Sequence, residues 1–158
     1  MAFKKILVPH DGSKTSDNAV DGAIELAKMS NDSHIILLHV IPEMQIPLVL
    51  ERPIRSHKTG ETTTTTEYWK ELYEEIKSSA LKMLEKVKLK CKTAGISAET
   101  RSVVGYPSDV IIKHAEKDNV DIVVMGTVGL RGISRIRALG SVARRVSEEA
   151  RCPVLLIH

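Results

Sequence analysis

Residues 120–147 read VDIVVMGTVGLRGISRIRALGSVARRVS, and the character of this stretch changes twice. It begins with an apolar, β-branched run that is typical of a buried strand. Glycines then follow at a regular spacing of three, at Gly126, Gly129 and Gly132. From Gly140 onwards, apolar residues recur at the spacing of a helix. The stretch therefore predicts a strand, a glycine-rich loop and the N-terminus of a helix.

A loop of this kind can hold an anion. Glycine has no Cβ, so backbone N–H groups can approach a ligand closely and the chain can take a positive φ. The following helix adds unpaired N–H groups and the positive end of its dipole. Between Asp121 and Glu148 there is no acidic residue, but there are the arginines Arg131, Arg135, Arg137, Arg144 and Arg145. This combination favours a phosphate chain as the ligand; a plain surface turn would explain one or two of the glycines.

The rest of the chain alternates apolar strands with amphipathic helices. Strands are predicted at residues 4–9, 34–41, 96–104, 120–125 and 153–157. Four helices are predicted. The first ends near Ser30, the second and third span residues 68–93 and 107–118, and the fourth begins near Gly140. Such alternation implies right-handed crossovers and a parallel sheet with helices on both faces. We therefore expect an α/β, Rossmann-like, doubly wound sheet of order 3-2-1-4-5, in which the loops after strands 1 and 4 meet at the switch point where ligands bind.

Residues 42–66 interrupt this alternation. They contain three prolines, Gly60 and five consecutive threonines. A structureless segment of that length is usually functional or disordered. We predict a single domain over residues 1–158 with an irregular insertion at about 42–66, mobile and close to the crevice entrance.

Composition narrows the class of protein. The hydrophobic share of 42% and the charged share of 27% are ordinary for a soluble globular protein. No apolar run has the length of a signal peptide core or a membrane span, so we expect a cytoplasmic protein without a membrane partner. Aromatic residues make up only 3% of the chain, which leaves little for base stacking. Nucleic acid is therefore not the expected partner, although the arginine stretch is the feature that would contact it.

Several short motifs follow one another along the chain. ILVPHDGS lies in the first strand and its turn, and LLHVI, GYPSDVI and CPVLLI follow in order. MGTVGLRGISRIRALGSVARRV resembles the ATP-binding signature of the universal stress protein family, G-x2-G-x9-G-[ST]. The chain thus resembles the ATP-binding branch of that family. It departs at one point, because ten residues rather than nine separate Gly129 from Gly140. The extra residue falls within 136–139 and can shift Gly140 and Ser141 relative to Gly129.

The resemblance implies an ATP site in the crevice. Asp11 would accept hydrogen bonds from the ribose hydroxyls, with a turn or helix-capping role as its alternative. The backbone at Val40 would meet the adenine edge and Met125 would close the crevice floor, with core packing as the alternative for both. Gly126 would let the backbone approach the ribose, and Ser141 is a phosphate donor, an N-cap or both. The complete implied set is Pro9, Asp11, Val40, Met125, Gly126, Gly129, Leu130, Arg131, Gly132, Gly140, Ser141 and Val142, in which Gly129 to Gly132 would wrap the phosphates and the last three would donate from the helix N-terminus.

Motifs for catalysis are missing from the sequence. It has no GxxxxGK[ST], no GxGxxG after the first strand and no histidines at metal-ligand spacing. We expect a nucleotide-binding regulatory protein of the stress response rather than an enzyme, with Mg²⁺ or Mn²⁺ carried on the phosphates of ATP. The resemblance also implies a homodimer formed through the last strand. The alternative is an interaction protein of the same fold that binds no nucleotide, which the extra residue would favour.

Overall fold

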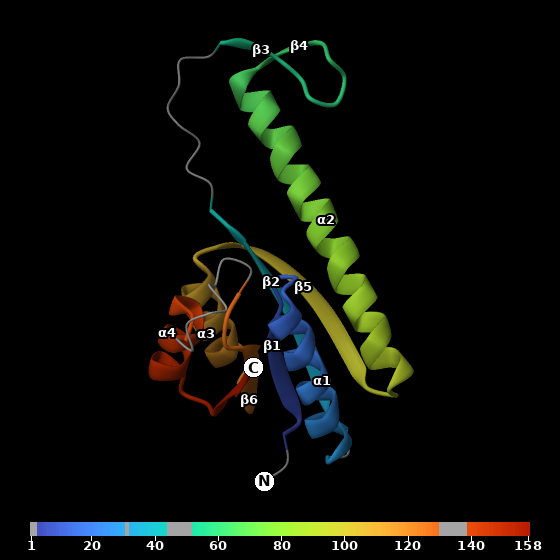
Figure 1. Ribbon diagram of the computed structural model, residues 1–158, viewed down its shortest axis with the longest axis vertical. Coiled ribbons are helices and arrows are strands. Elements are labelled where there is room, and N and C mark those ends of the chain that lie inside the picture. The colour runs from blue at the N-terminus through green and yellow to red at the C-terminus, as the bar shows by residue number, and fades with distance from the viewer. Residues whose placement is uncertain (1–2, 31, 44–51, 130–138) are drawn as a thin grey trace.

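Five parallel strands form the central sheet of the computed structural model, which describes residues 3–30, 32–43, 52–129 and 139–158. Their order is β5-β2-β1-β6-β7, which in chain order of these five strands is 3-2-1-4-5 (Figure 1). The predicted doubly wound topology is therefore confirmed. The strands are β1 (Lys5–Pro9), β2 (His34–Pro42), β5 (Ser97–Gly105), β6 (Ile122–Gly126) and β7 (Val154–Ile157).

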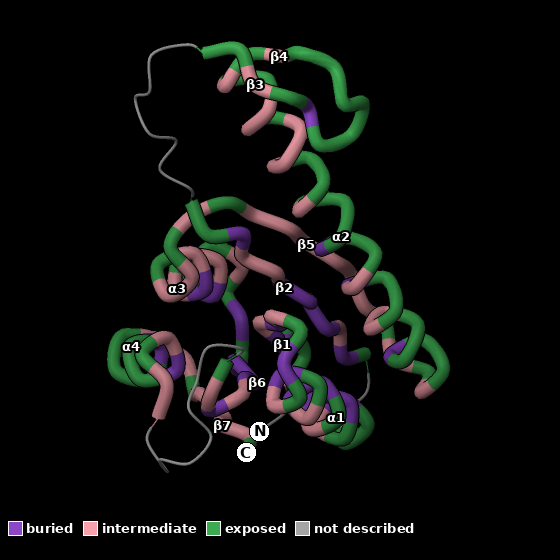
Figure 2. The backbone as a smooth tube through the Cα atoms, turned by 45° about the horizontal axis from the view of Figure 1, so that its top comes forward, coloured by how far each residue is buried: buried purple, intermediate pink, exposed green. Residues whose placement is uncertain are grey.

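Helices cover both faces of the sheet, as the alternation of elements predicts (Figure 2). On one face α1 (Lys14–Lys28) and α2 (Thr65–Thr93) pack on Ile6, Val8 and Leu37. On the other, α3 (Pro107–Lys117) and α4 (Ser141–Glu149) pack on Leu7, Leu38 and Val123. Successive strand residues point to opposite faces, so a strand buried on both faces must be apolar throughout, which is why β1 and β2 read as continuous apolar runs.

The helix ends follow local chemistry. Ser13 caps α1 by accepting the N–H of Ser16 at 3.2 Å. Gly95 follows the C-cap of α2 with φ +77°, a conformation that only glycine adopts readily, and Pro107 is the first residue of α3. The helix α2 begins three residues before the predicted position because Thr64 accepts the N–H of Glu67 at 3.2 Å and acts as its N-cap.

The prediction of an irregular segment is wrong for its second half. Two short strands, β3 (Pro53–Arg55) and β4 (Thr62–Thr64), pair antiparallel there. The threonines are β-branched and suit a strand once a partner is present. The connecting turn closes where the Ser56 N–H donates to Glu61 O at 2.8 Å. Residues 44–51 lie outside the described part of the chain.

The hairpin and the first half of α2 form an arm, residues 52–79, that stands clear of the sheet (Figure 1). A helix of 29 residues is about 43 Å long, whereas the nine residues of β5 extend about 30 Å. The helix is therefore longer than the sheet that it covers. Its buried residues, Ala80, Leu84 and Cys91, all lie in its second half. The described part of the arm therefore extends beyond the sheet (Figure 1).

Side chains of α2 hold the hairpin in place. Ser56 Oγ donates to Glu71 Oε2 at 2.8 Å, and His57 Nε2 donates to Glu75 Oε2 at 2.7 Å. The His57 ring also meets Tyr68 edge to face, with 5.3 Å between ring centroids. The arm is thus stabilised mainly by polar and aromatic contacts within itself.

Acid is expected to loosen the hairpin from α2. The hydrogen bond from His57 is the main cause that lowers the pKa of Glu75 below its ordinary value. A lowered pKa stabilises the folded form above the unfolded pKa, about 4.3, and this contribution is lost as the pH falls through the folded pKa. Trp69, the only tryptophan, lies next to Tyr68 and reports the change by fluorescence. Glu75→Gln should shrink the transition below pH 4.3; an unchanged titration in that variant would contradict the assignment.

Candidate crevice at the ends of β1 and β6

The loops after β1 and β6 meet at the carboxyl edge of the sheet, as predicted from the topology. The two strands are adjacent, with Ile6 paired to Ile122 and Leu7 to Val123. Beyond the strand ends, the hydroxyl of Thr15 donates to the carbonyl of Val128. Two segments more than a hundred residues apart in sequence are therefore joined at this edge.

Asp11 belongs to the loop after β1 and has a turn role. Its Oδ1 accepts the N–H of Ser13 at 3.0 Å, across Gly12, which has φ +87°. This is the Asx-turn alternative considered for Asp11. The other oxygen lies against the glycine loop, because a Cβ placed on Gly129 would come within 2.5 Å of Asp11 Oδ2. The turn thus orients the carboxylate toward Gly129, where a ligand of the glycine loop would also lie.

The glycines of the loop are required by close approach. A Cβ on Gly126 would lie 2.7 Å from Thr15 Oγ1 and 2.9 Å from the Thr15 carbonyl carbon. A Cβ on Gly140 would lie 3.1 Å from Thr127 O, the atom to which the Gly140 N–H donates at 2.8 Å. The expected positive φ is wrong for the described members of the motif, because the described glycines with positive φ are Gly12, Gly60, Gly95 and Gly105. Lack of a side chain, rather than an unusual backbone angle, is what these positions need.

The helix α4 begins at the end of the glycine motif. Gly140 is its N-cap, with φ −60° and ψ 151°, and Ser141 is its first helical residue. The N-cap alternative for Ser141 is therefore wrong, because the N-cap is Gly140, which has no side chain to cap the helix. The N–H groups of Ser141 and Val142 belong to the first turn, where a helix has no carbonyl partners of its own. Groups at this position of a helix can bind an anion, and the helix dipole favours one.

The remaining members of the predicted set differ in exposure. Met125 is 5% exposed and belongs to the core that α3 and α4 cover, which matches its core alternative. Val40 pairs with Val103 on β5 and is only partly buried. Pro9 ends β1 and is also partly buried. Leu130, Arg131 and Gly132 lie outside the described residues, as do positions 136–138, where most of the interval with the extra residue falls.

The whole chain has counterparts among known proteins. The universal stress protein family matches residues 2–158. The chain belongs to this family. Universal stress protein YxiE of Bacillus subtilis is 35% identical over 156 residues, which cover 99% of each chain. Universal stress protein MJ0577 of Methanocaldococcus jannaschii is 33% identical over 158 residues, 98% of this chain and 94% of that one.

Solved structures of the family share the fold. The structure of MJ0577 superposes with a TM-score of 0.81 at 30% identity and covers 99% of this chain and 96% of that chain. A universal stress protein in complex with cAMP superposes with a TM-score of 0.69 at 26% identity, covering 100% and 98%. The family and the doubly wound fold predicted from the sequence are therefore confirmed.

Sequence reasoning about this universal stress protein missed two residues that fix the crevice loops. His10 is 3% exposed, donates from Nε2 to Asp17 Oδ1 at 2.9 Å, and accepts His39 Nδ1–H on its carbonyl at 2.7 Å. Thr15 bonds to Val128. Their residue types alone carry no signal for these roles. The seven-residue spacing of His10 and Asp17 is compatible with such a contact but does not predict it.

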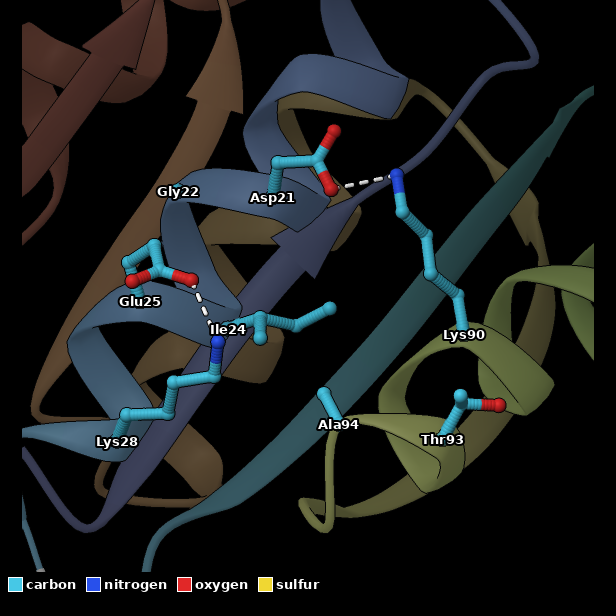
Figure 3. A pocket seen from close by; sticks show the side chains of 8 residues that line it. All are labelled: Asp21, Gly22, Ile24, Glu25, Lys28, Lys90, Thr93 and Ala94. Atoms are coloured by element: carbon cyan, nitrogen blue, oxygen red, sulfur yellow. Dashed lines mark hydrogen bonds and ion pairs between the residues drawn. The ribbon is translucent and has the colours of Figure 1, made fainter.

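A groove elsewhere on the molecule is less suited to a ligand. It has a volume of about 540 Å³ and lies between α1 and the C-terminal end of α2 (Figure 3). Two of its lysines already pair with carboxylates, Lys90 with Asp21 at 2.5 Å and Lys28 with Glu25 at 2.7 Å. The charged groups of both ion pairs are therefore bonded to each other rather than directed at a ligand. Among the described residues, no cluster of three or more histidine, cysteine, aspartate or glutamate side chains could hold a metal ion, and no helix is long and apolar enough to cross a membrane.

Proposed function

We propose that this universal stress protein binds ATP in the crevice between the β1 and β6 loops and acts as a cytoplasmic, nucleotide-dependent regulatory module of the stress response rather than as an enzyme. The observation that carries the proposal is the Asp11 carboxylate against Gly129, near the N-terminus of α4, whose N-cap is the glycine Gly140. An acceptor for ribose hydroxyls and donors for phosphates then lie on the two sides of one crevice. The relative crystallised with cAMP supports an adenine nucleotide as the class of ligand.

Each group has a defined task in this proposal. Asp11 accepts from the ribose, and its bond to the Ser13 N–H keeps the carboxylate in place. The first N–H groups of α4 donate to the phosphates, helped by the helix dipole. The partly buried Val40 lines the adenine side from the end of β2. Leu130, Arg131 and Gly132 complete the phosphate loop, and Mg²⁺ or Mn²⁺ is carried by the phosphates themselves.

The energies are sufficient for useful affinity. A hydrogen bond to a charged group contributes roughly 1.5–3 kcal/mol. A few such bonds, together with burial of the adenine, reach about 8 kcal/mol, which corresponds to a micromolar dissociation constant. Neither a Walker lysine nor a dedicated protein metal site is required for binding of this strength.

Equilibrium binding of ATP to the purified protein tests the proposal. Asp11→Ala is expected to weaken ATP and AMP by similar factors, about tenfold, because the lost contact is to the ribose that both share. Asp21→Ala is the matched control, since this aspartate lies within α1 and pairs with Lys90 outside the crevice. A parent protein that binds no adenine nucleotide would favour the alternative, an interaction protein of the same fold.

A homodimer formed through β7 is the expected assembly. All four residues of this edge strand are apolar, yet each is only partly buried. The carbonyls of Pro153 and Ile157 accept bonds from the β6 side, so by alternation the N–H of Val154 points to the open edge. An uncovered apolar edge pairs readily with another strand. Sedimentation at micromolar concentration should give twice the mass of the chain, and Val154→Pro, which removes the outward N–H, should give a monomer. A monomeric parent would contradict this assembly.

A further inference from the structure

We infer that Thr15 is a positioning residue that fixes the backbone of residues 126–129, at the start of the phosphate loop, and hence the affinity for the nucleotide's phosphates. The inference rests on the proposed function. Thr15 lies in the first turn of α1, outside the glycine motif and on the other side of the crevice. Its hydroxyl donates to the carbonyl of Val128, the residue before Gly129. A side chain of one loop thus fixes the backbone of the other.

The direction of this hydrogen bond is set by its neighbours. Thr15 Oγ1 lies 3.1 Å from Ser13 Oγ as well as against Val128 O. A carbonyl can only accept, so the single proton of Thr15 must go to Val128. Ser13 must then donate its own proton to Thr15, and Ser13 Oγ accepts the N–H of Ser16 at 3.2 Å. The cap of α1 and the tie to Val128 therefore form one chain of donors that ends on the phosphate loop.

The glycine at position 126 allows this contact. A Cβ there would lie 2.7 Å from Thr15 Oγ1 and 2.9 Å from Thr15 Cβ and its carbonyl carbon. The end of β6 can come so close to α1 only because Gly126 has no side chain. Thr15 therefore lies against the loop at both Gly126 and Val128, on either side of Thr127. This proximity gives Gly126 a packing reason in addition to the ribose contact proposed for it.

The hydrogen bond from Thr15 matters for anion binding because it holds a backbone carbonyl of the glycine loop. Thr127 O accepts the Gly140 N–H at 2.8 Å, and Val128 O accepts the Thr15 hydroxyl. Both oxygens carry partial negative charge and would repel a phosphate if they turned toward it. Held as they are, these oxygens stay bonded to the protein, and the ligand meets the N–H groups of Gly129 and of the first turn of α4 instead of the carbonyls. Releasing Val128 O should therefore weaken phosphate binding more than ribose or adenine binding.

The test compares three substitutions that remove different parts of the Thr15 side chain. Thr15→Val keeps the branched shape and loses the hydroxyl, so ATP affinity should fall about fivefold to tenfold, the loss expected for one hydrogen bond, while AMP affinity should fall less. Thr15→Ser keeps the hydroxyl and should bind ATP within about twofold of the parent. Thr15→Ala is measured beside Thr15→Val because it introduces no apolar branch, and it should show the same preferential loss of ATP. Thr93→Val, which removes a hydroxyl bonded to Leu89 O at 2.9 Å in α2, is the control and should bind as the parent does.

The outcomes separate this inference from the proposed function. Parental ATP binding by folded Thr15→Val and Thr15→Ala would overturn the positioning role and leave the nucleotide site intact. Equal losses in Thr15→Val and Thr15→Ser, or equal losses for ATP and AMP, would overturn it too, because they would indicate packing alone. A parent protein that binds neither ATP nor AMP would refute the proposed function, and the inference with it.

Discussion

Gly129→Val is expected to lower the affinity for ATP at least tenfold, about 1.4 kcal/mol, while the protein stays folded. The first atom of the new side chain would lie 2.5 Å from Asp11 Oδ2, so either the carboxylate or the loop must move. The fold should tolerate the change because Gly129 is exposed and its φ does not lie in the left-handed region. Calorimetric titration with ATP and AMP measures the effect, and circular dichroism verifies folding. Since the displaced group is the proposed ribose acceptor, AMP should be weakened as well.

A double-mutant cycle shows whether Asp11 is the group that the new side chain meets. Gly129→Ala should cost less ATP affinity in the Asp11→Ala background, where Oδ2 is missing, than in the parent. Residues in contact give non-additive energies of about 0.5–3 kcal/mol. Additive losses would place the Asp11 carboxylate away from Gly129, and parental ATP binding by folded Gly129→Val would mean that the phosphate loop is misassigned.

Leu84→Ala should lower the free energy of unfolding by about 2–5 kcal/mol, the usual cost of truncating a buried leucine. Leu84 is fully buried and belongs to the core between α2 and the sheet. The arm provides little burial of its own, so the second half of α2 must hold the whole helix. Denaturation in urea measures the change as a shift of the midpoint.

Leu81→Ala is the matched control on the same helix. Its side chain is 40% exposed, and truncation there should cost well under half as much. Equal losses at both positions would mean that the register of α2 on the sheet is misplaced. Retention of the full midpoint in Leu84→Ala would contradict the role of this leucine as an anchor.

The parts of the fold that were predictable depend on local pattern. Ile6, Leu7 and Val8 are apolar without interruption because β1 is buried on both faces, and this is legible in the sequence. Gly95 and Pro107 mark helix ends by their own backbone preferences. From such signals the strand order follows through general rules of connection.

The parts that were missed depend on contacts between distant residues. The threonines at 62–64 form a strand because residues 53–55 pair with them, and nothing local specifies that partner. Thr15 and Val128 are 113 residues apart, and only the assembled sheet brings them together. Glycine at 126 and 129 was expected for close approach to a ligand, and the structure adds a second reason, the contacts with Thr15 and Asp11 on the opposite loop, which no local pattern indicates.

Thr127 is hydrogen-bonded both to the strand of the proposed interface and to the start of the helix at the proposed phosphate site. Its N–H donates to Ile157 O in the last strand at 2.9 Å, and its own carbonyl accepts from Gly140 at the start of α4 at 2.8 Å. A shift of β7 on pairing with a second chain would therefore be transmitted to the phosphate loop through two adjoining bonds. Thermodynamic linkage makes such coupling reciprocal: if pairing tightens ATP binding by some factor, ATP must strengthen pairing by the same factor. The affinity for ATP would then depend on the concentration of the protein itself, and an affinity that is constant across the dimer–monomer transition would show that Thr127 transmits nothing.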